Sequence, residues 1–249
     1  MALITIHFSS QKLATQTIVR VIMPDHPIDH PLKTIWWLHG LGDDGSVWIR
    51  KTRLELFASN YEVAIILPDM QRSFAQNIPE GLPFFDYLSL ELPQYLQSIF
   101  PLSKDRKNNY LVGTSMGGYS AYKWAAICPK KFSYVATLSP VTNLETVTTF
   151  MSDYQSIIGK NPNIIPSLNE LMSKKVAELK KINWIQYIGT DDSLRSDSEN
   201  FTSKIKQELG INLNPHVSTG NHNWTFWDDK LPQIFEWLPL SRITTGGMQ

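Results

Sequence analysis

The chain has 249 residues, of which 42% are hydrophobic and 18% charged, and its 23 basic residues equal its 23 acidic residues in number. This length, without a low-complexity tract, is typical of one globular domain, so residues 1–249 are predicted to form a single domain. The balanced charge offers no basic field for a nucleic acid or an anionic membrane, which favours a small-molecule partner.

The cysteine content and the first residues indicate the compartment. A single cysteine, Cys128, excludes an intrachain disulfide and a Cys-x-x-Cys metal or redox motif. Residues 1–8 alternate between apolar and polar, which is typical of a strand and not of a signal peptide. No apolar run approaches the length of a membrane span. We therefore expect a cytoplasmic protein with no membrane partner.

Strand and helix patterns alternate along the chain. Residues 3–8 and 17–23 are predicted to pair antiparallel at one edge of a sheet. Further strands are predicted at 34–38, 63–67, 109–113, 134–138, 184–188 and 212–217. Helices are predicted at about 48–57, at 84–100, from Ser115 to near Pro129, and at 199–209 and 224–237. Repeated strand, loop and helix units of this length predict an α/β fold with a doubly wound, mainly parallel sheet.

Residues 141–181 interrupt this alternation with helical segments and polar loops, among them Asn161-Pro162-Asn163. We predict a helical insert that lies over the sheet and walls a substrate pocket. The final residues, 243–249, are predicted to be frayed.

The segment Gly113-Thr114-Ser115-Met116-Gly117 follows an apolar strand pattern and opens a helix. A nucleophilic serine is presented on such a strand-to-helix turn, and glycines on both sides let strand and helix approach each other. Three fixed positions also recur by chance, and an ordinary Gly-rich turn is the alternative. The interpretation therefore depends on the rest of the chain.

A serine hydroxyl needs a base that a third group orients. In an open parallel sheet such groups collect beyond the carboxyl ends of the strands. His222 lies in the loop between the last strand and the last helix and is the predicted base, whereas His216 is the alternative and is expected to point into sheet packing. Asp191 and Asp192 both follow the strand at 184–188, and spacing does not choose between them. The order serine, acid, histidine is that of the α/β-hydrolase triad.

An acyl-transfer site also needs donors for the oxyanion of its tetrahedral intermediate. The backbone N–H of Met116, at a helix N-terminus, is one predicted donor. The second is expected from the loop His39-Gly40-Leu41-Gly42, where Leu41 is the best choice because the glycines let an N–H point inward. We expect His39 to hold this loop by hydrogen bonds and not to transfer protons. The chemistry requires no metal and no organic cofactor.

At this point the chain resembles the esterase D group of α/β-hydrolases, and most closely the tributyrin esterases of lactic-acid bacteria and streptococci. The resemblance covers nearly the whole length, and its most specific segments are Ser115-Met116-Gly117-Gly118-Tyr119 and Gly220-Asn221-His222-Asn223-Trp224. Further matching segments are Ile4-Thr5-Ile6-His7-Phe8-Ser9-Ser10, Leu38-His39-Gly40 with Trp48, Pro68-Asp69 with Arg72-Ser73-Phe74, Glu91-Leu92-Pro93, and Trp227.

The resemblance implies Ser115 as nucleophile, His222 as base, and the N–H groups of Leu41 and Met116 as the oxyanion hole. In the family the acid lies in a Gly-x-x-Asp-x-Leu segment, which here is 189–194 and selects Asp192. Two segments depart from the family pattern. Residues 40–44 lack the Thr-Cys pattern of the S-formylglutathione hydrolase branch, and the usual Gly-Gly-His reads Gly-Asn-His.

The resemblance therefore implies a serine carboxylesterase that acts on a short-chain acyl or acetyl ester as its small-molecule partner. An S-formylglutathione hydrolase-type thioesterase is the alternative function. A hydrolase-fold binding protein without activity is the third interpretation, and it is disfavoured because every catalytic group is present. Whether the chain forms a homo-oligomer stays open at this stage.

Overall fold

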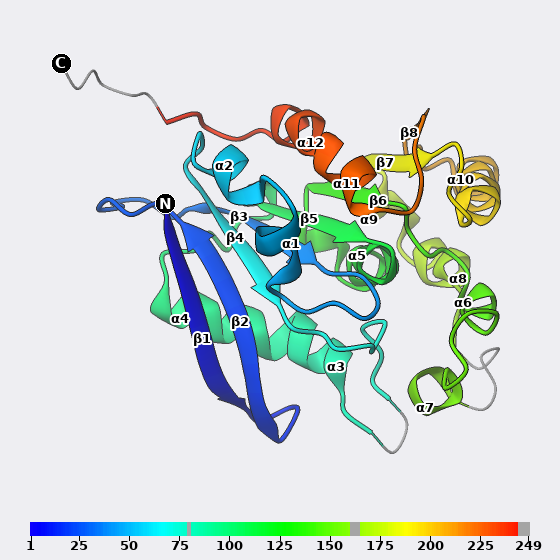
Figure 1. The fold of residues 1–249 in the computed structure, drawn as a ribbon, viewed down its shortest axis with the longest axis horizontal. Helices are drawn as coiled ribbons and strands as arrows, with labels where there is room; N and C mark the ends of the chain where they lie inside the picture. Colours follow the sequence, from blue (N-terminus) through cyan, green and yellow to red (C-terminus); the bar gives the residue numbers. More distant parts are fainter. Residues whose placement is uncertain (79–80, 160–164, 244–249) are drawn as a thin grey trace.

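A computed structural model describes residues 1–78, 81–159 and 165–243 of the chain. Its centre is an eight-stranded sheet in the order β1-β2-β4-β3-β5-β6-β7-β8 (Figure 1). The strands are β1 Ala2–Ser10, β2 Thr15–Met23, β3 Lys33–Leu38, β4 Val63–Pro68, β5 Asn109–Thr114, β6 Tyr134–Leu138, β7 Asn183–Gly189 and β8 Pro215–Ser218. The pairs from β4 to β8 are parallel, which confirms the predicted mainly parallel α/β sheet.

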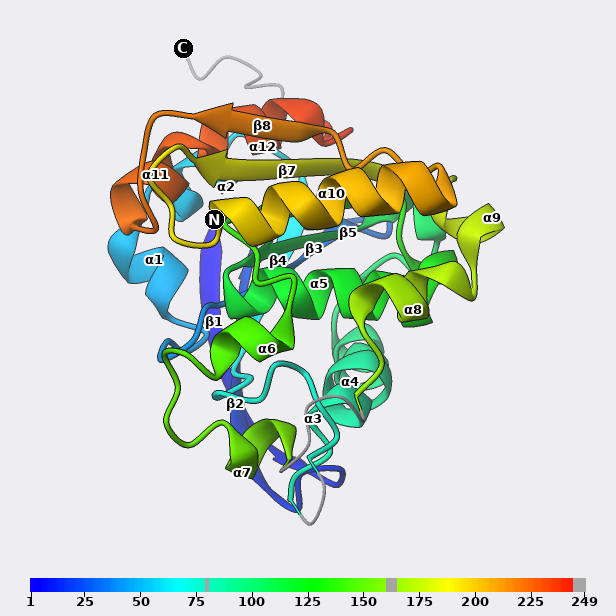
Figure 2. The same cartoon turned by 90° about the vertical axis from the view of Figure 1, so that its right-hand side faces the viewer.

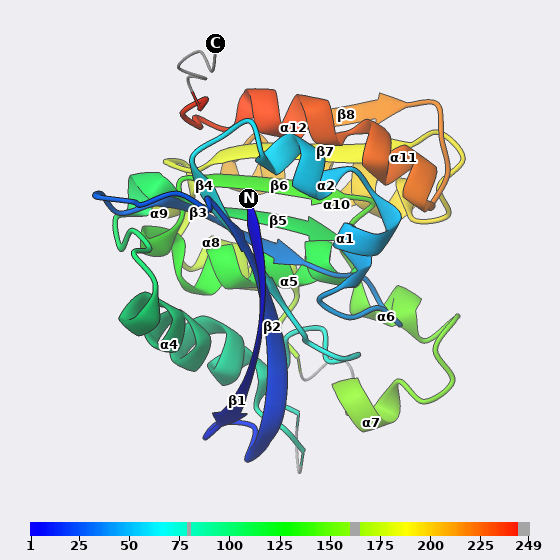
Figure 3. The same ribbon diagram turned by 60° about the vertical axis from the view of Figure 1, so that its left-hand side comes forward.

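The first two strands form the predicted antiparallel pair at one edge of the sheet, with Ala2 opposite Met23. The pair is longer than predicted, because Ser9 and Ser10 belong to β1 and do not form the turn. The Glu91 carboxylate accepts hydrogen bonds from the Ser10 hydroxyl and the Gln11 N–H, which holds the turn of this hairpin. Figure 3 shows the hairpin extending beyond the rest of the sheet.

Helices cover both faces of the sheet. One face carries α1 Val47–Lys51, α2 Leu54–Ala58, α11 Trp224–Asp229 and α12 Leu231–Trp237. The other carries α3 Phe84–Asp86, α4 Leu92–Ile99, α5 Met116–Ile127, α8 Leu168–Ser173 and α10 Arg195–Leu209. Short 3-10 helices span Arg106–Asn108 and Pro129–Lys131.

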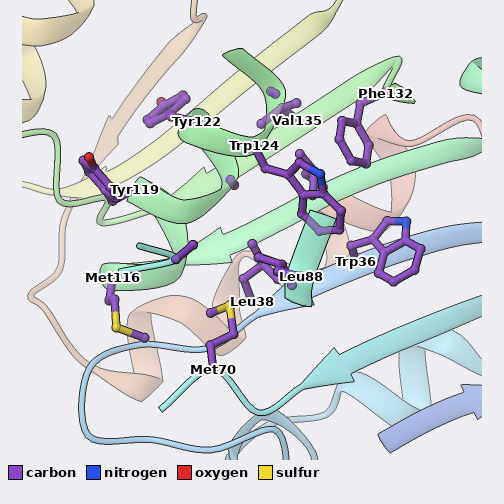
Figure 4. Packing of buried hydrophobic residues seen from close by; sticks show 14 of the residues in the cluster. Trp36, Leu38, Met70, Leu88, Met116, Tyr119, Tyr122, Trp124, Phe132 and Val135 are labelled. Atoms are coloured by element: carbon purple, nitrogen blue, oxygen red, sulfur yellow. The ribbon is translucent and has the colours of Figure 1, made fainter. Parts of the chain in front are cut away.

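The strand period of two divides the core between these faces. Along β3, Trp36 packs with the α5 side and Trp37 with the α12 side, and both are almost fully buried. The ring centroid of Trp36 lies 5.4 Å from that of Trp124 on α5, which in turn lies 5.0 Å from that of Phe132 (Figure 4). A double-sided core of this kind confirms that β3 is buried on both faces.

Several predicted helices are interrupted. The helix predicted at 48–57 is two helices that meet near Arg53, and the helix predicted at 224–237 breaks at Lys230, next to Pro232. The segment predicted at 84–100 is helical from Phe84 to Ile99, with a π-helical turn at Tyr87–Glu91. Pro93 has no N–H to give to the carbonyl of Ser89, four residues earlier, and the Lys131 ammonium donates to that carbonyl at 2.7 Å instead.

Two boundaries near the carboxyl end also differ from prediction. Helix α10 begins at Arg195, four residues earlier than the predicted 199. Strand β8 covers only Pro215–Ser218, whereas 212–217 was predicted, because Asn214 takes a positive φ of 44° just before the strand.

Between β6 and β7 the described residues form α6 Leu144–Val147, α7 Gln155–Ile158, α8 and α9 Val176–Leu179. Figure 2 shows α8 beside α5, with α6 and α7 running on toward the β1-β2 hairpin. The predicted loop Asn161-Pro162-Asn163 and all but Ile243 of the predicted frayed tail lie outside the described residues. None of the described helices combines the length and the apolarity needed to cross a bilayer.

Candidate active site

Ser115 lies on a sharp turn between β5 and α5. It has φ 54° and ψ −114°, which is strained for a residue with a side chain, and its N–H donates to the carbonyl of Leu138 at 2.9 Å. A Cβ atom on Gly113 would lie 2.1 Å from the carbonyl oxygen of Gly117, and one on Gly117 would lie 2.2 Å from that of Leu38. Both positions therefore require glycine.

Three side chains from distant parts of the chain meet at this turn. The Nε2 atom of His222 lies 3.1 Å from the Ser115 Oγ atom. The Nδ1 atom of the same ring lies 3.1 Å from each carboxylate oxygen of Asp192. The Asp192 carboxylate requires a proton donor, so Nδ1 carries the proton and Nε2 presents its lone pair to the serine hydroxyl.

The loops that carry the acid and the histidine touch each other. A Cβ atom on Gly189, at the end of β7, would lie 2.2 Å from the carbonyl oxygen of Gly220. Gly220 itself has φ 151° and accepts the N–H of Asp191 at 2.9 Å. Asn221 replaces the second glycine of the family's Gly-Gly-His pattern, but Gly220, which this close approach requires, is kept.

Asp192 is buried and ionised. Burial opposes the charge of its carboxylate, but the hydrogen bond and the charge of His222, together with the Ser139 hydroxyl and the Leu194 N–H, outweigh burial and lower the pKa. The Leu194 N–H donates to Oδ1 of Asp192 at 2.9 Å, which fixes the carboxylate. Asp191 is exposed, and in the described part of the chain the His222 ring bonds to the carboxylate of Asp192 and not to that of Asp191.

Ser139 and Trp227 support this group. The sequence matched Trp227 to the family without giving it a role, and it did not single out Ser139. The Trp227 indole N–H donates to the buried Ser139 Oγ atom at 3.0 Å, and its ring meets the His222 ring edge-on with centroids 5.0 Å apart. The signal for Ser139 was its place directly after β6, at the carboxyl end where functional groups collect.

The alternative base, His216, lies away from this group. It is exposed on the edge strand β8, and its ring centroid lies 5.4 Å from that of Tyr187. The prediction that it points into sheet packing is wrong, because β8 is the edge strand of the described sheet and its first three residues, His216 among them, are exposed.

Two backbone N–H groups belong to residues near Ser115, one in a turn that approaches the serine and one in the residue after it. The Gly40-Leu41-Gly42-Asp43 turn is closed by the Asp43 N–H, which donates to the Gly40 carbonyl at 3.4 Å, and Gly42 has φ 81° as the third position of a type II turn requires. A Cβ atom on Gly40 would lie 3.6 Å from the Ser115 Cβ atom, so this turn passes close to the serine.

The N–H of Leu41 lies in this turn, and the N–H of Met116 lies in the first turn of α5. Neither is bound to another group among the described residues. Unpaired backbone N–H groups suit an oxyanion, and the dipole at the N-terminus of α5 adds to the attraction at Met116.

His39 is almost fully buried behind this turn, with 1% of its surface exposed. Its Nδ1–H donates to the Gly40 carbonyl at 2.8 Å, and its Nε2 atom accepts the Met70 N–H at 2.9 Å. Because a backbone N–H can only donate, Nε2 holds no proton and its lone pair is occupied. His39 is therefore neutral and ties the turn to the segment after β4.

No metal site accompanies these groups in residues 1–78, 81–159 and 165–243, where no set of three or more histidine, cysteine and carboxylate side chains is arranged to hold a metal ion. The arrangement offers a hydroxyl, a base that an acid orients, and two N–H donors. These groups can perform nucleophilic acyl transfer.

The chain is similar in sequence and in structure to known hydrolases. A family model described as putative esterase matches residues 10–238. An acetyl esterase of Caldicellulosiruptor saccharolyticus is 27% identical over 265 residues, which cover 96% of this chain and 98% of the relative. The structure of FphF, a fluorophosphonate-binding serine hydrolase of Staphylococcus aureus, is 29% identical with a TM-score of 0.87 over 95% of this chain and 98% of that one. The S-formylglutathione hydrolase FrmB of Staphylococcus aureus is 28% identical with a TM-score of 0.86 and the same coverage.

Proposed function

The chain belongs to the putative esterase family and is a carboxylic ester hydrolase with the α/β-hydrolase fold, and on this basis we propose that Ser115, His222 and Asp192 form its catalytic triad. The observation that carries the proposal is the pair of contacts made by the His222 ring, 3.1 Å to the Ser115 hydroxyl and 3.1 Å to both oxygens of Asp192.

In the proposed mechanism, Ser115 Oγ attacks the ester carbonyl carbon while His222 Nε2 takes the hydroxyl proton. The carbonyl oxygen becomes an oxyanion that the N–H groups of Leu41 and Met116 stabilise. His222 then gives its proton to the leaving alcohol oxygen as the bond to carbon breaks. Water, deprotonated by the same Nε2 atom, releases the acid from the acyl-enzyme. Asp192 orients the imidazole and stabilises its charged form.

We propose acetyl and other short-chain acyl esters as substrates. The side chains of Met70, Phe74 and Tyr119 are each at most 1% exposed, and the Phe74 and Tyr119 rings meet edge-on at 6.0 Å. Figure 4 shows Met70, Met116 and Leu38 grouped near the start of α5. Bulky buried side chains near the start of α5 favour a small acyl group, and the similarity to an acetyl esterase supports the same substrate class.

Thioester hydrolysis is the second candidate, because one similar structure is an S-formylglutathione hydrolase. The same catalytic groups would serve it. The single cysteine supports a cytoplasmic enzyme. The balanced charge supports one that acts on a small ester without a nucleic-acid or membrane partner.

The test is turnover of p-nitrophenyl esters from acetate to decanoate, and of S-formylglutathione, by the wild type and by Ser115→Ala. We expect the highest kcat/KM with short oxygen esters and loss of turnover in the variant. Faster cleavage of S-formylglutathione would favour the thioesterase. Equal rates for wild type and Ser115→Ala would disprove the nucleophile assignment.

A further inference from the structure

An ion pair joins the loop that follows β4 to the segment that follows β6. The Arg72 guanidinium donates from both terminal nitrogens to the two carboxylate oxygens of Asp153, at 2.7 Å each. Arg72 belongs to the segment 69–76 after β4, and Asp153 immediately precedes α7 in the segment after β6. We call the joined segments 69–76 and 148–154 the strap.

The sheet order places the strap across the nucleophile. Strands β4 and β6 flank β3 and β5, whose carboxyl ends carry Leu41 and Ser115. Three strand spacings separate β4 from β6, which is about 14 Å. The ion pair therefore links two segments that start on either side of the catalytic strands. In Figures 1 and 2 the loop between β8 and α11 lies on one side of the ends of β3 and β5, and α7 with the segment after β4 lies on the other.

The chemistry assigns the acyl group to the strap side, on the basis of the proposed function. The leaving oxygen must face His222, which protonates it, and the oxyanion must face the N–H groups of Leu41 and Met116. The remaining substituent of the tetrahedral carbon is the acyl chain. It extends away from His222, toward the segments that Arg72 and Asp153 join.

One half of the strap is firmly held. The buried Lys123 ammonium donates to the Ala75 carbonyl at 2.7 Å and to the Gln76 side-chain oxygen at 2.5 Å. The Met70 N–H is fixed by His39. Gln71, Phe74 and Ala75 all have positive φ values, a strained backbone that persists only where its surroundings hold it.

The ion pair is the part of the strap that can open. The side chains of Arg72 and Asp153 are 44% and 50% exposed, and water therefore competes for both charges. A longer acyl chain that needs the space between the two segments must separate this pair, whereas an acetyl group need not.

We propose that the Arg72–Asp153 ion pair is a specificity-determining contact that limits the length of the acyl group. A long acyl chain must separate the two charges to bind, and this cost lowers kcat/KM for long esters relative to short ones. The proposal assigns these residues no role in bond making or breaking.

The test measures the ratio of kcat/KM for p-nitrophenyl octanoate to that for p-nitrophenyl acetate in one preparation of each variant. Charge reversal in Arg72→Asp or in Asp153→Arg should raise this ratio about fivefold, near the upper limit for an exposed ion pair. The double variant, with both charges reversed, should return the ratio to the wild-type value. Glu178→Lys, which breaks the exposed Lys181–Glu178 pair at 2.9 Å on α9, is the matched control and should leave the ratio unchanged.

The possible failures are distinguishable. An unchanged ratio in both single variants, or a ratio that stays raised in the double variant, overturns the strap proposal while wild-type turnover of the acetate ester still supports the esterase. A wild type inactive on both esters overturns the proposed function, and the strap proposal with it.

Discussion

Asp192 and Asp191 stand next to each other, and their asparagine variants should behave very differently. In Asp192→Asn the Leu194 N–H, which now donates to Oδ1 at 2.9 Å, requires an acceptor and so fixes the amide oxygen at that position. The amide NH₂ then occupies the position of Oδ2. Nδ1 of His222 lies 3.1 Å from both oxygen positions, so it then faces a donor beside an amide oxygen that the Leu194 N–H already occupies.

An NH₂ group facing Nδ1 favours the wrong tautomer of the imidazole. Nδ1 becomes the acceptor, the proton moves to Nε2, and Nε2 can no longer take the proton of the Ser115 hydroxyl, 3.1 Å away. We expect kcat to fall about a thousandfold to ten thousandfold, which is roughly 4 to 5.5 kcal/mol at 1.36 kcal/mol per tenfold. The fold should survive because the substitution keeps the size of the side chain.

The assay is steady-state hydrolysis of p-nitrophenyl acetate, with circular dichroism as the control for folding. Asp191→Asn should stay within twofold of wild type, because Asp191 is exposed and engages the His222 loop through its backbone N–H alone. A folded Asp192→Asn that keeps more than a tenth of the activity would refute the reasoning, and so would an equal loss in Asp191→Asn.

Three further variants test the surroundings of the nucleophile. Gly117→Ala should be inactive and less stable by a few kcal/mol (about 1–3 for overpacking), since its Cβ would lie 2.2 Å from the Leu38 carbonyl oxygen; a melting temperature like that of wild type would contradict this. Met116→Ala should lower stability to urea by about 2–5 kcal/mol, because the side chain is fully buried, yet keep kcat within tenfold, because the backbone N–H remains; a loss like that of Ser115→Ala would contradict the assignment. Burial lowers the pKa of Lys123 to about 7. Between pH 7 and pH 10 the unfolded chain therefore binds up to one more proton than the folded chain. The free energy of unfolding of the wild type consequently rises with pH in this range. Lys123→Met lacks this gain, so its stability relative to wild type should fall between pH 6.5 and pH 9.5 in urea unfolding; a constant difference would show that Lys123 does not titrate in this range.

The sheet could be predicted because its signal is local. Continuous apolar runs such as 34–38 and 63–67 mark strands that are buried on both faces, and the structure has strands at both. The helix interruptions depend on tertiary contacts. The π-helical turn before Pro93 is accommodated because Lys131, far along the chain, satisfies the carbonyl of Ser89.

The candidate site could be predicted in part because its residues follow strand ends in a defined order. Ser115, His222 and the aspartate pair were found in this way. The choice between the aspartates came from family resemblance, because both follow β7. The bond from the Asp191 N–H to the Gly220 carbonyl, which sets the conformation of this loop, has no signal in the sequence. The Arg72–Asp153 pair gave no sequence signal, since it depends on how two loops from separate strands meet.

The central claim is that Ser115 carries the acyl group, and covalent trapping tests it most directly. The wild-type protein is mixed with p-nitrophenyl acetate, quenched in acid within the first turnovers, and analysed by intact mass and by peptide mapping. The account predicts an added acetyl group on the peptide that contains Ser115, and none in Ser115→Ala. An acetyl group on another residue, or hydrolysis by Ser115→Ala at the wild-type rate, would contradict it.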